Sequence, residues 1–472
     1  MQKPQHECGI FGVYFPGEDV SRLTFYGLYA LQHRGQESVG IAVSKNAKIK
    51  AHKKMGFVRE FFDQDITRLK GDIAVGHTRY SNTGGSSLIN AQPAIYGNIA
   101  IAENGNLVNP EALRRKLAKF GYHPSYDKNG KCSSDGELIA QAIHSQKGDG
   151  IVEKIKNAAA RDLKGAYSLT ILADNALIGV KDPLGFWPLC LGKLNNKGYA
   201  LASESCALDV IGAKYLRELE PGEVLTIDKN GTRSHFLPNT PKRQSARCSF
   251  DINYFLRPDS LLATGARAYE VREKLGQVLA RKNRLDADVV IEIPNSGQFG
   301  AIGYAQASGI PLKVGFIKNS YIGRTFISPD QRIRQLGVKL KLNPIPRVIA
   351  GKKIILVDDS IVRGTSSRQI TEQLFKIGAK EVHWRSTFPQ VTNPCFFGID
   401  IGTNDELISA SKTPRQVAKE LGATSVVFNT LEDFLEAVGL NPKTACTGCI
   451  TGVYPINLPH RERNKFALEV AE

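Results

Sequence analysis

The chain contains no apolar run close to the roughly 20 consecutive residues that a helix needs to cross a bilayer. Its opening segment, MQKPQHECGIFGVYF, lacks the basic stretch followed by a long apolar stretch that is typical of a secretory signal peptide. No internal repeat of the length found in solenoid proteins is present either. From the length of 472 residues, we therefore expect a cytoplasmic chain with two or more globular domains, each with its own core.

Acidic residues are the scarcer charged class, with 46 Asp and Glu against 62 Lys and Arg, so the formal net charge is +16. An excess of positive charge suits either a nucleic acid or a small anionic substrate. The chain has no low-complexity basic tail and no RNA- or DNA-binding signature. We therefore expect small anionic substrates and no partner among nucleic acids or membranes.

Cysteine is also scarce, with eight residues in the whole chain. In a long chain of cytosolic composition, cysteines rarely form a disulfide framework, so thiolate chemistry and metal ligation are the functions to consider. Cys446 and Cys449 form a C-T-G-C motif, which suits a metal site or a redox pair. Cys132, Cys190 and Cys206 have no accompanying motif, and we expect them to be packing residues.

Residues 353–370, KIILVDDSIVRGTSSRQI, predict a buried parallel strand followed by a phosphate-binding turn. Asp358 and Asp359 come directly after the apolar run, and a Gly-Thr-Ser-Ser turn precedes a helical pattern that starts at Arg368. Backbone N–H groups at the start of a helix bind phosphate, and paired carboxylates suit ribose hydroxyls or a magnesium ion. An ordinary strand-to-helix turn of an α/β sheet is the alternative.

Two different strand patterns divide the chain near Pro241. Between residues 163 and 228, alternating apolar residues with Asn, Gly and Pro turns predict an antiparallel sheet that forms one layer. After the boundary, a helical pattern over 266–284 is followed by alternating strands and helices as far as Phe428, which predicts a parallel sheet. Residues 318–341 carry six basic side chains against one acid, and a solvated loop is one interpretation of them.

Cys8 precedes an apolar run, GIFGVYF, that we expect to be a strand, and four further segments follow it in order. They are LQHRGQESVGIAV (31–43), GHTRYSNTGG (76–85), NAQP (90–93) and AENGNLVN (102–109). Together they resemble the glutaminase domain of the N-terminal-nucleophile amidotransferases. The resemblance covers residues 8–240 and implies an α+β domain with an αββα sandwich, in which two sheets are packed between two helical layers.

This resemblance also implies roles for individual residues. Cys8 would be the nucleophile, with its own α-amine as the base after removal of a propeptide, residues 1–7. The other implied residues are Asn104 and Gly105 for the oxyanion, Arg79 for the α-carboxylate of glutamine, Asp135 for its α-ammonium, and His33 and Arg34 as residues that shape the site.

The run VDDSIVRGTSSR resembles the phosphoribosyl pyrophosphate (PRPP) signature of the type I phosphoribosyltransferases. It implies an α/β domain with a parallel sheet over residues 241–472. Residues 318–341 would then be a mobile lid that closes over pyrophosphate. The implied ligands of Mg2+ are Ser296, Asp358 and Asp359. The implied PRPP-binding residues are Lys318, Arg324, Asp358, Asp359, Ser360, Arg363, Gly364, Thr365 and Ser366.

Two further cysteine segments, RCSF at Cys248 and NPCFFGID at Cys395, resemble those of the cluster-binding members of this enzyme group. With Cys446 and Cys449 they imply a [4Fe-4S] cluster that clamps the C-terminal tail onto both domains. Structural zinc and, for the C-T-G-C motif alone, a redox pair are the alternatives.

The chain as a whole resembles the glutamine PRPP amidotransferases, of the iron–sulfur type with an N-terminal propeptide. The resemblance implies that glutamine is hydrolysed and its ammonia channelled to C1 of PRPP, which gives 5-phosphoribosylamine, glutamate and pyrophosphate in the first committed step of purine biosynthesis. It also implies inhibition by purine nucleotides and a homo-oligomer, either a tetramer or a dimer. A hexosamine-forming amidotransferase would lack the VDDSIVRGTSSR run, and a PRPP- or nucleotide-sensing paralogue with reduced turnover is the second alternative.

Four sites depart from the pattern of this family. Glu103 stands where His is common, Gly136 where Thr is usual, and the pair Phe186-Trp187 where an Ile-Arg pair is usual. Asn295 stands where an acid is more usual, which weakens the prediction of Mg2+ binding in that turn. None of the four removes an implied catalytic group, but the loss of an arginine at Trp187 could alter how the two active sites communicate.

Overall fold

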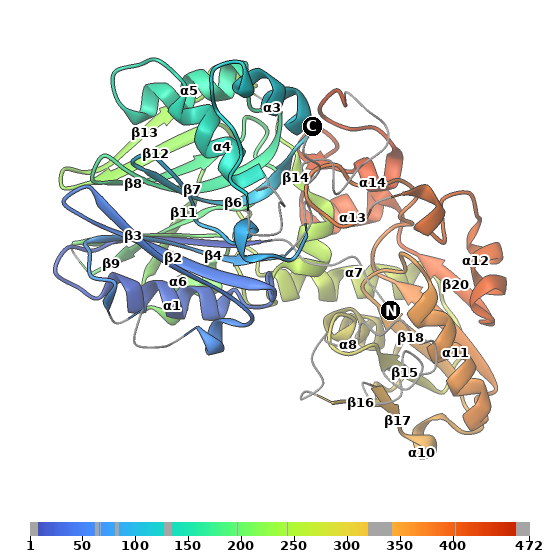
Figure 1. Cartoon of the computed structure of the whole chain (residues 1–472). Coiled ribbons are helices and arrows are strands. Elements are labelled where there is room, and N and C mark those ends of the chain that lie inside the picture. The colour runs from blue at the N-terminus through green and yellow to red at the C-terminus, as the bar shows by residue number, and fades with distance from the viewer. Residues whose placement is uncertain are drawn as a thin grey trace.

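The structure, a computed structural model, describes residues 8–61, 66, 68–80, 85–126, 135–195, 197–242, 244–319, 342–401 and 403–458. The predicted propeptide, Cys132, Arg324 and most of the basic segment 318–341 lie outside these ranges. Figure 1 shows two parts that meet at a junction, with two stacked sheets in the first part and a smaller main sheet in the second.

Two antiparallel sheets form the first part. In spatial order, the first sheet contains β11 (Lys214–Glu218), β9 (Cys190–Leu194), β10 (Gly198–Ala202), β1 (Gly9–Tyr14), β4 (Ile73–Arg79), β2 (Ser38–Lys45) and β3 (Lys48–Met55). The second sheet contains β13 (Gly231–Phe236), β12 (Glu223–Asp228), β8 (Ala176–Lys181), β7 (Gly165–Ala173), β6 (Ile99–Leu107) and β5 (Ala94–Tyr96).

Helices cover the outer face of each sheet (Figure 1). Because side chains alternate along a strand, Phe11 of β1 packs into the helical layer, while Ile10 packs into the core between the sheets. The predicted αββα sandwich is therefore confirmed. The first sheet is covered by α1 (Val20–Ala30) and α6 (Ser205–Val210), and the second by α3 (Pro110–Ala118), α4 (Asp135–His144) and α5 (Ile151–Arg161).

The strands between residues 163 and 228 are antiparallel as predicted, but the prediction that they form one layer is wrong. β7, β8 and β12 belong to the second sheet, whereas β9, β10 and β11 belong to the first. The chain crosses between the layers after β8, where the Asp182 carboxylate accepts hydrogen bonds from the backbone of Leu184 (2.9 Å) and Phe186 (3.1 Å). The alternating pattern could not assign the layer, because strands of both sheets have one face in the shared core.

A parallel sheet forms the core of the second part, in the order β15 (Val289–Glu292), β18 (Lys353–Asp358), β19 (Glu381–Ser386) and β20 (Ser425–Phe428). One face packs on α7 (Ala268–Lys282) and α8 (Gln298–Ser308), and the other on α11 (Thr365–Ile377) and α12 (Pro414–Leu421) (Figure 1). Burial on both faces explains the uninterrupted apolar run in β18 and confirms the predicted parallel sheet.

Helix α11 begins at Thr365, earlier than the predicted start at Arg368. Its first turn, Thr-Ser-Ser, contains no apolar residue, so the helical period of apolar residues could not reveal it. Hydroxyl-bearing side chains are common at helix starts because they can bond the exposed backbone N–H groups. The Ser and Thr residues of the predicted phosphate-binding turn therefore lie in the helix itself.

Several short elements complete the two parts. They are the parallel pair β14 (Arg247–Cys248) and β21 (Ala445–Cys446), the antiparallel pair β16 (Phe316–Lys318) and β17 (Leu342–Pro344), the helices α10 (Pro346–Ile349), α13 (Leu431–Val438) and α14 (Gly448–Thr451), the 3-10 turns η1 (Val58–Glu60), η2 (Leu88–Asn90) and η4 (Asn404–Glu406), and a single π-helical turn, η3 (Asp251–Phe255).

One apolar cluster spans the junction between the two parts, and we refer to it as the junction cluster. From the first part it takes Phe186 and Trp187, which follow β8, and from the second it takes aromatic side chains of several loops and helices. Both parts therefore share a dry core at the place where they meet. Its largest side chains are Phe186, Trp187, Phe250, Phe255, Phe388, Phe396, Phe397 and Phe434.

None of the helices in the described ranges combines the length and the apolar character that spanning a lipid bilayer requires.

Leu356, on β18, is fully buried beneath α11, and its replacement by Ala should destabilise the second part. We expect Leu356→Ala to lower the free energy of unfolding by about 2–5 kcal/mol, because the lost methyl groups leave a cavity. Denaturant unfolding followed by tryptophan fluorescence measures this, since Trp384 lies in the same cluster. Glu372→Ala, on the exposed side of α11, is the control and should change stability by less than about 0.5 kcal/mol. Equal losses in the two variants would contradict the described packing.

Two candidate active sites and a group of buried cysteines

Cys8 lies immediately before β1, at one end of the space between the stacked sheets. Ile10 faces that space, so Cys8, two residues earlier on an alternating backbone, faces it as well. The buried thiol donates a hydrogen bond to the carbonyl of Tyr80 over 3.5 Å. Burial raises the pKa of Cys8 to about 12, although the bond to Tyr80 and the charge of Arg79 act in the opposite direction. The thiol is therefore protonated at neutral pH.

Asn104 and Gly105 lie on β6 and face the same site. Ala100 and Ala102 of this strand point into the core between the sheets, so Asn104 does too. Its side-chain amide is buried, and neither Nδ2 nor Oδ1 has a hydrogen-bond partner among the described residues. Leaving a buried amide without a partner is costly, which favours a polar ligand at this position. At Gly105 φ is +153°, and an added Cβ would lie 2.0 Å from the carbonyl oxygen of Ala166, so only glycine fits.

Arg79 and Asp135 bring opposite charges to this site. Arg79 ends β4 and is buried; its Nη1 donates to the carbonyl of Gly85 at 3.0 Å and lies 3.7 Å from Oε2 of Glu37. Asp135 is the first residue of α4 and is also buried. The charge of Arg79 lowers the pKa of Cys8 and that of Asp135 raises it, which indicates that the three side chains are neighbours. Arg79 and Asp135 therefore act electrostatically on Cys8, and their roles in binding glutamine stay predictions.

The unusual residues Glu103 and Gly136 meet at Gln92, which sequence reasoning did not single out. Oε1 of Gln92 accepts a hydrogen bond from the backbone N–H of Glu103 at 2.7 Å. A Cβ at Gly136 would lie 2.8 Å from Nε2 of Gln92, so a threonine there would displace the Gln92 side chain. Burial, and next the charge of Asp135, raise the pKa of the Glu103 carboxyl well above its usual range, which favours its neutral form. The lack of a side chain at Gly136 therefore leaves room for Gln92, which in turn is bonded to the backbone of Glu103.

The second candidate site lies at the carboxyl end of β18. Oδ1 of Asp358 accepts hydrogen bonds from the hydroxyl of Ser296 at 3.2 Å and from the backbone N–H of Asp359 at 2.9 Å. Oδ2 of Asp359 accepts a bond from the hydroxyl of Ser360 at 2.6 Å. Both carboxylates are buried, and the first turn of α11 follows Gly364. This end of a parallel sheet is where ligands of α/β proteins bind.

The three basic residues predicted to bind PRPP are Lys318, Arg324 and Arg363, of which the structure describes Lys318 and Arg363. Lys318 is half-buried at the end of β16. The guanidinium of Arg363 donates to Oε2 of Glu406 at 2.7 Å and to the carbonyl of Asp400 at 3.3 Å. A phosphate would have to compete with these partners, so the role of Arg363 stays a prediction. Arg324 lies outside the described residues.

The cysteines at 248, 395, 446 and 449 are all buried in the junction cluster, and none of them forms a disulfide. Cys248 on β14 pairs in register with Cys446 on β21. Burial raises the pKa of Cys446 to about 12, and the charge of Cys395 raises it further, so these two thiols are neighbours. In the described ranges, no group of three or more His, Cys, Asp or Glu has the arrangement of a metal site.

Cys190 and Cys206 are buried together in the core under α1, apart from the junction cluster. They therefore pack in the interior of the first part, as we predicted from the lack of any motif around them.

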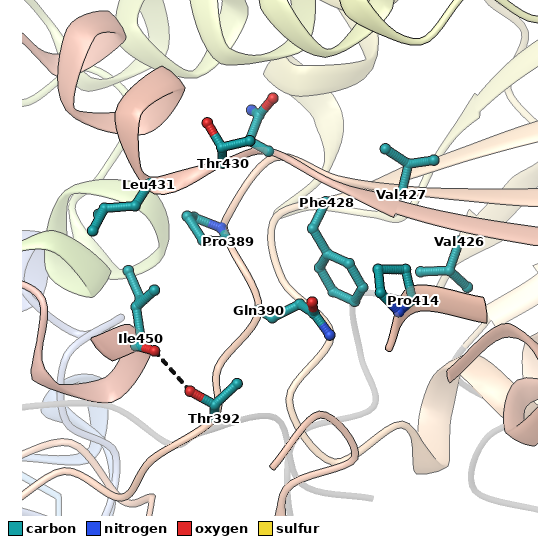
Figure 2. A pocket seen from close by; sticks show the side chains of 11 residues that line it. Pro389, Gln390, Thr392, Pro414, Val426, Val427, Phe428, Thr430, Leu431 and Ile450 are labelled. Carbon is teal, nitrogen blue, oxygen red and sulfur yellow. Dashed lines mark hydrogen bonds between the residues drawn. The ribbon is translucent and has the colours of Figure 1, made fainter. Parts of the chain in front are cut away.

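A separate hollow lies at the carboxyl ends of β19 and β20, and Figure 2 shows Gln390, Phe428 and Pro414 on its walls. None of its lining residues carries a charge. It is therefore poorly suited to a phosphate or pyrophosphate group, in contrast with the end of β18. Sequence reasoning gave no signal for this hollow, because its lining comes from five separate segments.

Comparison with known proteins decides the family. A family model described as the glutamine amidotransferase domain matches residues 77–210. The amidophosphoribosyltransferase of Synechococcus elongatus is 45% identical over 481 aligned residues, which cover 99% of this chain and 95% of that protein. The chain belongs to the amidophosphoribosyltransferase family.

Two solved structures share the fold of this chain. The glutamine PRPP amidotransferase from B. subtilis, complexed with ADP and GMP, superimposes with a TM-score of 0.87 at 39% identity and covers 97% of this chain and 99% of its own. A structure described as the allosteric regulatory enzyme of purine biosynthesis gives a TM-score of 0.90 at 39% identity. The match covers 98% of this chain and 99% of that one. The predicted fold class, enzyme class and place in purine biosynthesis are confirmed, and the hexosamine-forming alternative is wrong.

The contact between Gly136 and Gln92 leads to a prediction about the glutamine site. Gly136→Thr should lower glutamine-dependent activity by about tenfold or more, because the displaced Gln92 releases the backbone next to Asn104, and small misplacements at a reacting centre are costly. Activity supported by free ammonia, which needs only the second site, is the internal control and should not change. Steady-state kinetics with each nitrogen source measures both. Unchanged glutamine kinetics would contradict the contact.

Proposed function

We propose that the chain catalyses the complete reaction of its family, with a glutamine site at Cys8 and a PRPP site at Asp358 and Asp359. Glutamine, PRPP and water would give glutamate, pyrophosphate and 5-phosphoribosylamine. The main support is that Ser296, Asp358 and Asp359 lie together at the carboxyl end of β18 and that the two parts share a buried apolar cluster. We also propose that the enzyme works in the cytoplasm.

In the first half-reaction, the sulfur of Cys8 attacks the side-chain amide carbon of glutamine and expels ammonia, and water then hydrolyses the thioester. A base must take the thiol proton, because burial holds the pKa of Cys8 at about 12. Among the described residues, the hydrogen-bond partner of Sγ is a backbone carbonyl, which cannot serve as that base. We therefore assign this role to the α-amine of Cys8, freed by removal of residues 1–7.

The neighbouring residues would stabilise charge on the substrate. The amide of Asn104, which has no partner among the described residues, and the backbone N–H of Gly105 are proposed to donate to the oxyanion. Arg79 is proposed to hold the α-carboxylate of glutamine, and Asp135 its α-ammonium.

In the second half-reaction, ammonia attacks C1 of PRPP and the bond to pyrophosphate breaks. Asp358 and Asp359 are proposed to hold the ribose hydroxyls. The first turn of α11 is proposed to bind the 5-phosphate, through Thr365 and Ser366 in the turn and Ser360 and Gly364 before it. The oxygens of Ser296, Asp358 and Asp359 are a ligand set that fits Mg2+, which when bound would offset the charge of the pyrophosphate. The cations proposed to attract the pyrophosphate are Lys318, Arg363 and Arg324.

Separate loss of the two half-reactions is the test of this assignment. Cys8→Ala should abolish glutamine-dependent synthesis by at least about a thousandfold, as expected for a lost nucleophile, and leave ammonia-dependent synthesis intact. The double variant Asp358→Asn, Asp359→Asn should lose synthesis from either nitrogen source. Product assays with glutamine and with ammonia measure both effects. The control is Cys190→Ala, a buried cysteine outside the site, which should keep both activities.

Retention of glutamine-dependent synthesis in Cys8→Ala, or of PRPP consumption in the double variant, would overturn the proposal. The N-terminal mass of the active enzyme tests the processing step separately. An active enzyme that still begins at Met1 would remove the α-amine from the mechanism.

We also propose that Cys248, Cys395, Cys446 and Cys449 hold a [4Fe-4S] cluster. Four buried thiols that form no disulfide fit such a group, and a metal would be needed to keep them as thiolates, since burial raises the pKa of Cys446. The role of the iron–sulfur cluster would be structural, because the junction cluster surrounds it.

Cys449→Ser should therefore remove iron from the purified protein and lower its stability, since a structural cluster is lost with its ligand. Iron and sulfide analysis and the visible absorption spectrum of anaerobically purified protein measure this. Cys206→Ser, in the first part, is the matched control and should keep the iron. A wild-type protein that contains zinc and no iron would contradict the assignment.

Nucleotide regulation is proposed by analogy with the B. subtilis structure, which was complexed with ADP and GMP. We propose that purine nucleotides inhibit this chain as well and that it forms a homo-oligomer.

A further inference from the structure

Two buried carboxylates from different parts of the chain bind one arginine. Arg34, which follows α1, is fully buried; its Nε donates to Oε1 of Glu204 at 2.6 Å and its Nη2 to Oδ1 of Asp251 at 2.7 Å. The other oxygen of Asp251 accepts a bond from Nη2 of Arg247 at 2.8 Å. A buried charge that loses its partner is strongly destabilising, so these groups must move together. Arg34 therefore connects the first part firmly to η3, the turn that Asp251 begins.

The loop that carries Arg34 also contacts Arg79 of the glutamine site. Glu37 follows Arg34 in the same loop, and its backbone N–H donates to the carbonyl of Arg79 at 3.1 Å. The carboxylate of Glu37 lies 3.7 Å from Nη1 of Arg79. Because Arg79 is the residue assigned to the α-carboxylate of glutamine, a shift of the loop after α1 would change how glutamine is held.

Asn253, in the middle of η3, contacts the PRPP site. Nδ2 of Asn253 donates to the backbone carbonyl of Asp359 at 3.1 Å. The hydroxyl of Thr387 lies 3.3 Å from the same carbonyl and 3.4 Å from Oδ1 of Asn253. Within a single turn, η3 thus carries both Asp251, which is bonded to Arg34, and Asn253, which is bonded to the backbone of Asp359. Single π-helical turns often occur at functional positions.

Arg272 of α7 holds the backbone of this turn. Its Nη2 donates to the carbonyl of Ile252 at 3.1 Å and to that of Leu256 at 2.7 Å. Two hydrogen bonds from one buried guanidinium thus hold the backbone of η3 and limit its local rearrangement.

We propose that Asn253 and Asp251 are positioning residues that couple PRPP binding to glutamine hydrolysis, because η3 joins the Asp359 backbone to Arg34 and through it to the loop that holds Arg79. This inference rests on the proposed function of the two sites and adds the physical connection between them. When PRPP engages Asp359, the contact with Asn253 shifts η3, and the paired charges carry the shift to Arg34. Glutamine is then hydrolysed efficiently only when the acceptor of its ammonia is present.

Asn253→Ala tests this coupling. We expect ammonia-dependent synthesis and the slow glutamine hydrolysis seen without PRPP to be unchanged. The stimulation of glutamine hydrolysis by PRPP should fall by about fivefold or more, the lower range of a coupling between sites. The KM for glutamine in the presence of PRPP should rise correspondingly.

The matched control is Asn429→Ala. Asn429 is also a buried asparagine at the junction, and its Nδ2 donates to the carbonyls of Leu275 and Thr387 at 3.1 and 3.0 Å without bonding to η3. If Asn253 had only a structural role, both variants would lower the Tm and leave stimulation by PRPP intact, and the proposal would be overturned. Loss of stimulation in Asn253→Ala alone supports it.

A second pair of variants addresses the carboxylate. Asp251→Asn should lose stimulation by PRPP, whereas Asp251→Glu, which keeps the charge, should retain part of it. If Asn253→Ala does not fold, Thr387→Val takes its place, because it removes the hydroxyl beside Asp359 with little change of shape. Full stimulation in folded Thr387→Val and Asp251→Asn would overturn the proposal.

Failure of the coupling is distinguishable from failure of the proposed function. A wild-type protein that is stimulated by PRPP, with variants that are stimulated equally, rejects only the role of η3. A wild-type protein that does not hydrolyse glutamine at all rejects the proposed function itself.

Discussion

The buried ion pairs of Arg34 with Glu204 and Asp251 constrain the arrangement of the whole molecule. These groups have no contact with water, so each charge must keep its partner, and loss of one partner costs about 3–5 kcal/mol. The two parts therefore cannot slide past each other without breaking charged hydrogen bonds. The junction cluster adds contact between buried apolar side chains of both parts. Shielding from water is what a reaction that passes ammonia from one site to another requires.

Trp187 shows how this junction differs from the usual pattern of the family. Its indole Nε1 donates to the carbonyl of Phe397 at 3.1 Å, and its side chain is fully buried. Beside it, Nδ2 of Asn106, on the strand that carries Asn104, donates to the carbonyl of Phe396 at 2.9 Å. The segment that carries Cys395 is thus bonded directly to the glutamine part. Trp187 stands where an arginine is expected, and its bond to Phe397 is a direct contact between the two parts.

Sequence reasoning could predict the elements whose signal is local. The apolar run of β18 and the motifs around Cys8, Arg79 and Asn104 predicted a parallel sheet and an αββα sandwich, and both are present. The layer of β9, β10 and β11 could not be predicted, because strands of either sheet show the same alternation. The accommodation of Glu103 by Gln92 and Gly136, and the link from Arg34 to Asp251, depend on residues far apart in the chain. No spacing or composition marks such contacts, so they emerged only from the structure.

If the two sites act as one enzyme across this junction, ammonia passes from glutamine to PRPP without entering the solvent. The most direct test supplies glutamine labelled with heavy nitrogen in its amide, together with unlabelled ammonium, and measures the label in the trapped 5-phosphoribosylamine by mass spectrometry. Nearly all product nitrogen should be labelled at ammonium concentrations that alone support only slow synthesis. A label fraction that falls in proportion to the added ammonium would contradict it, because the nitrogen would then have passed through the solvent.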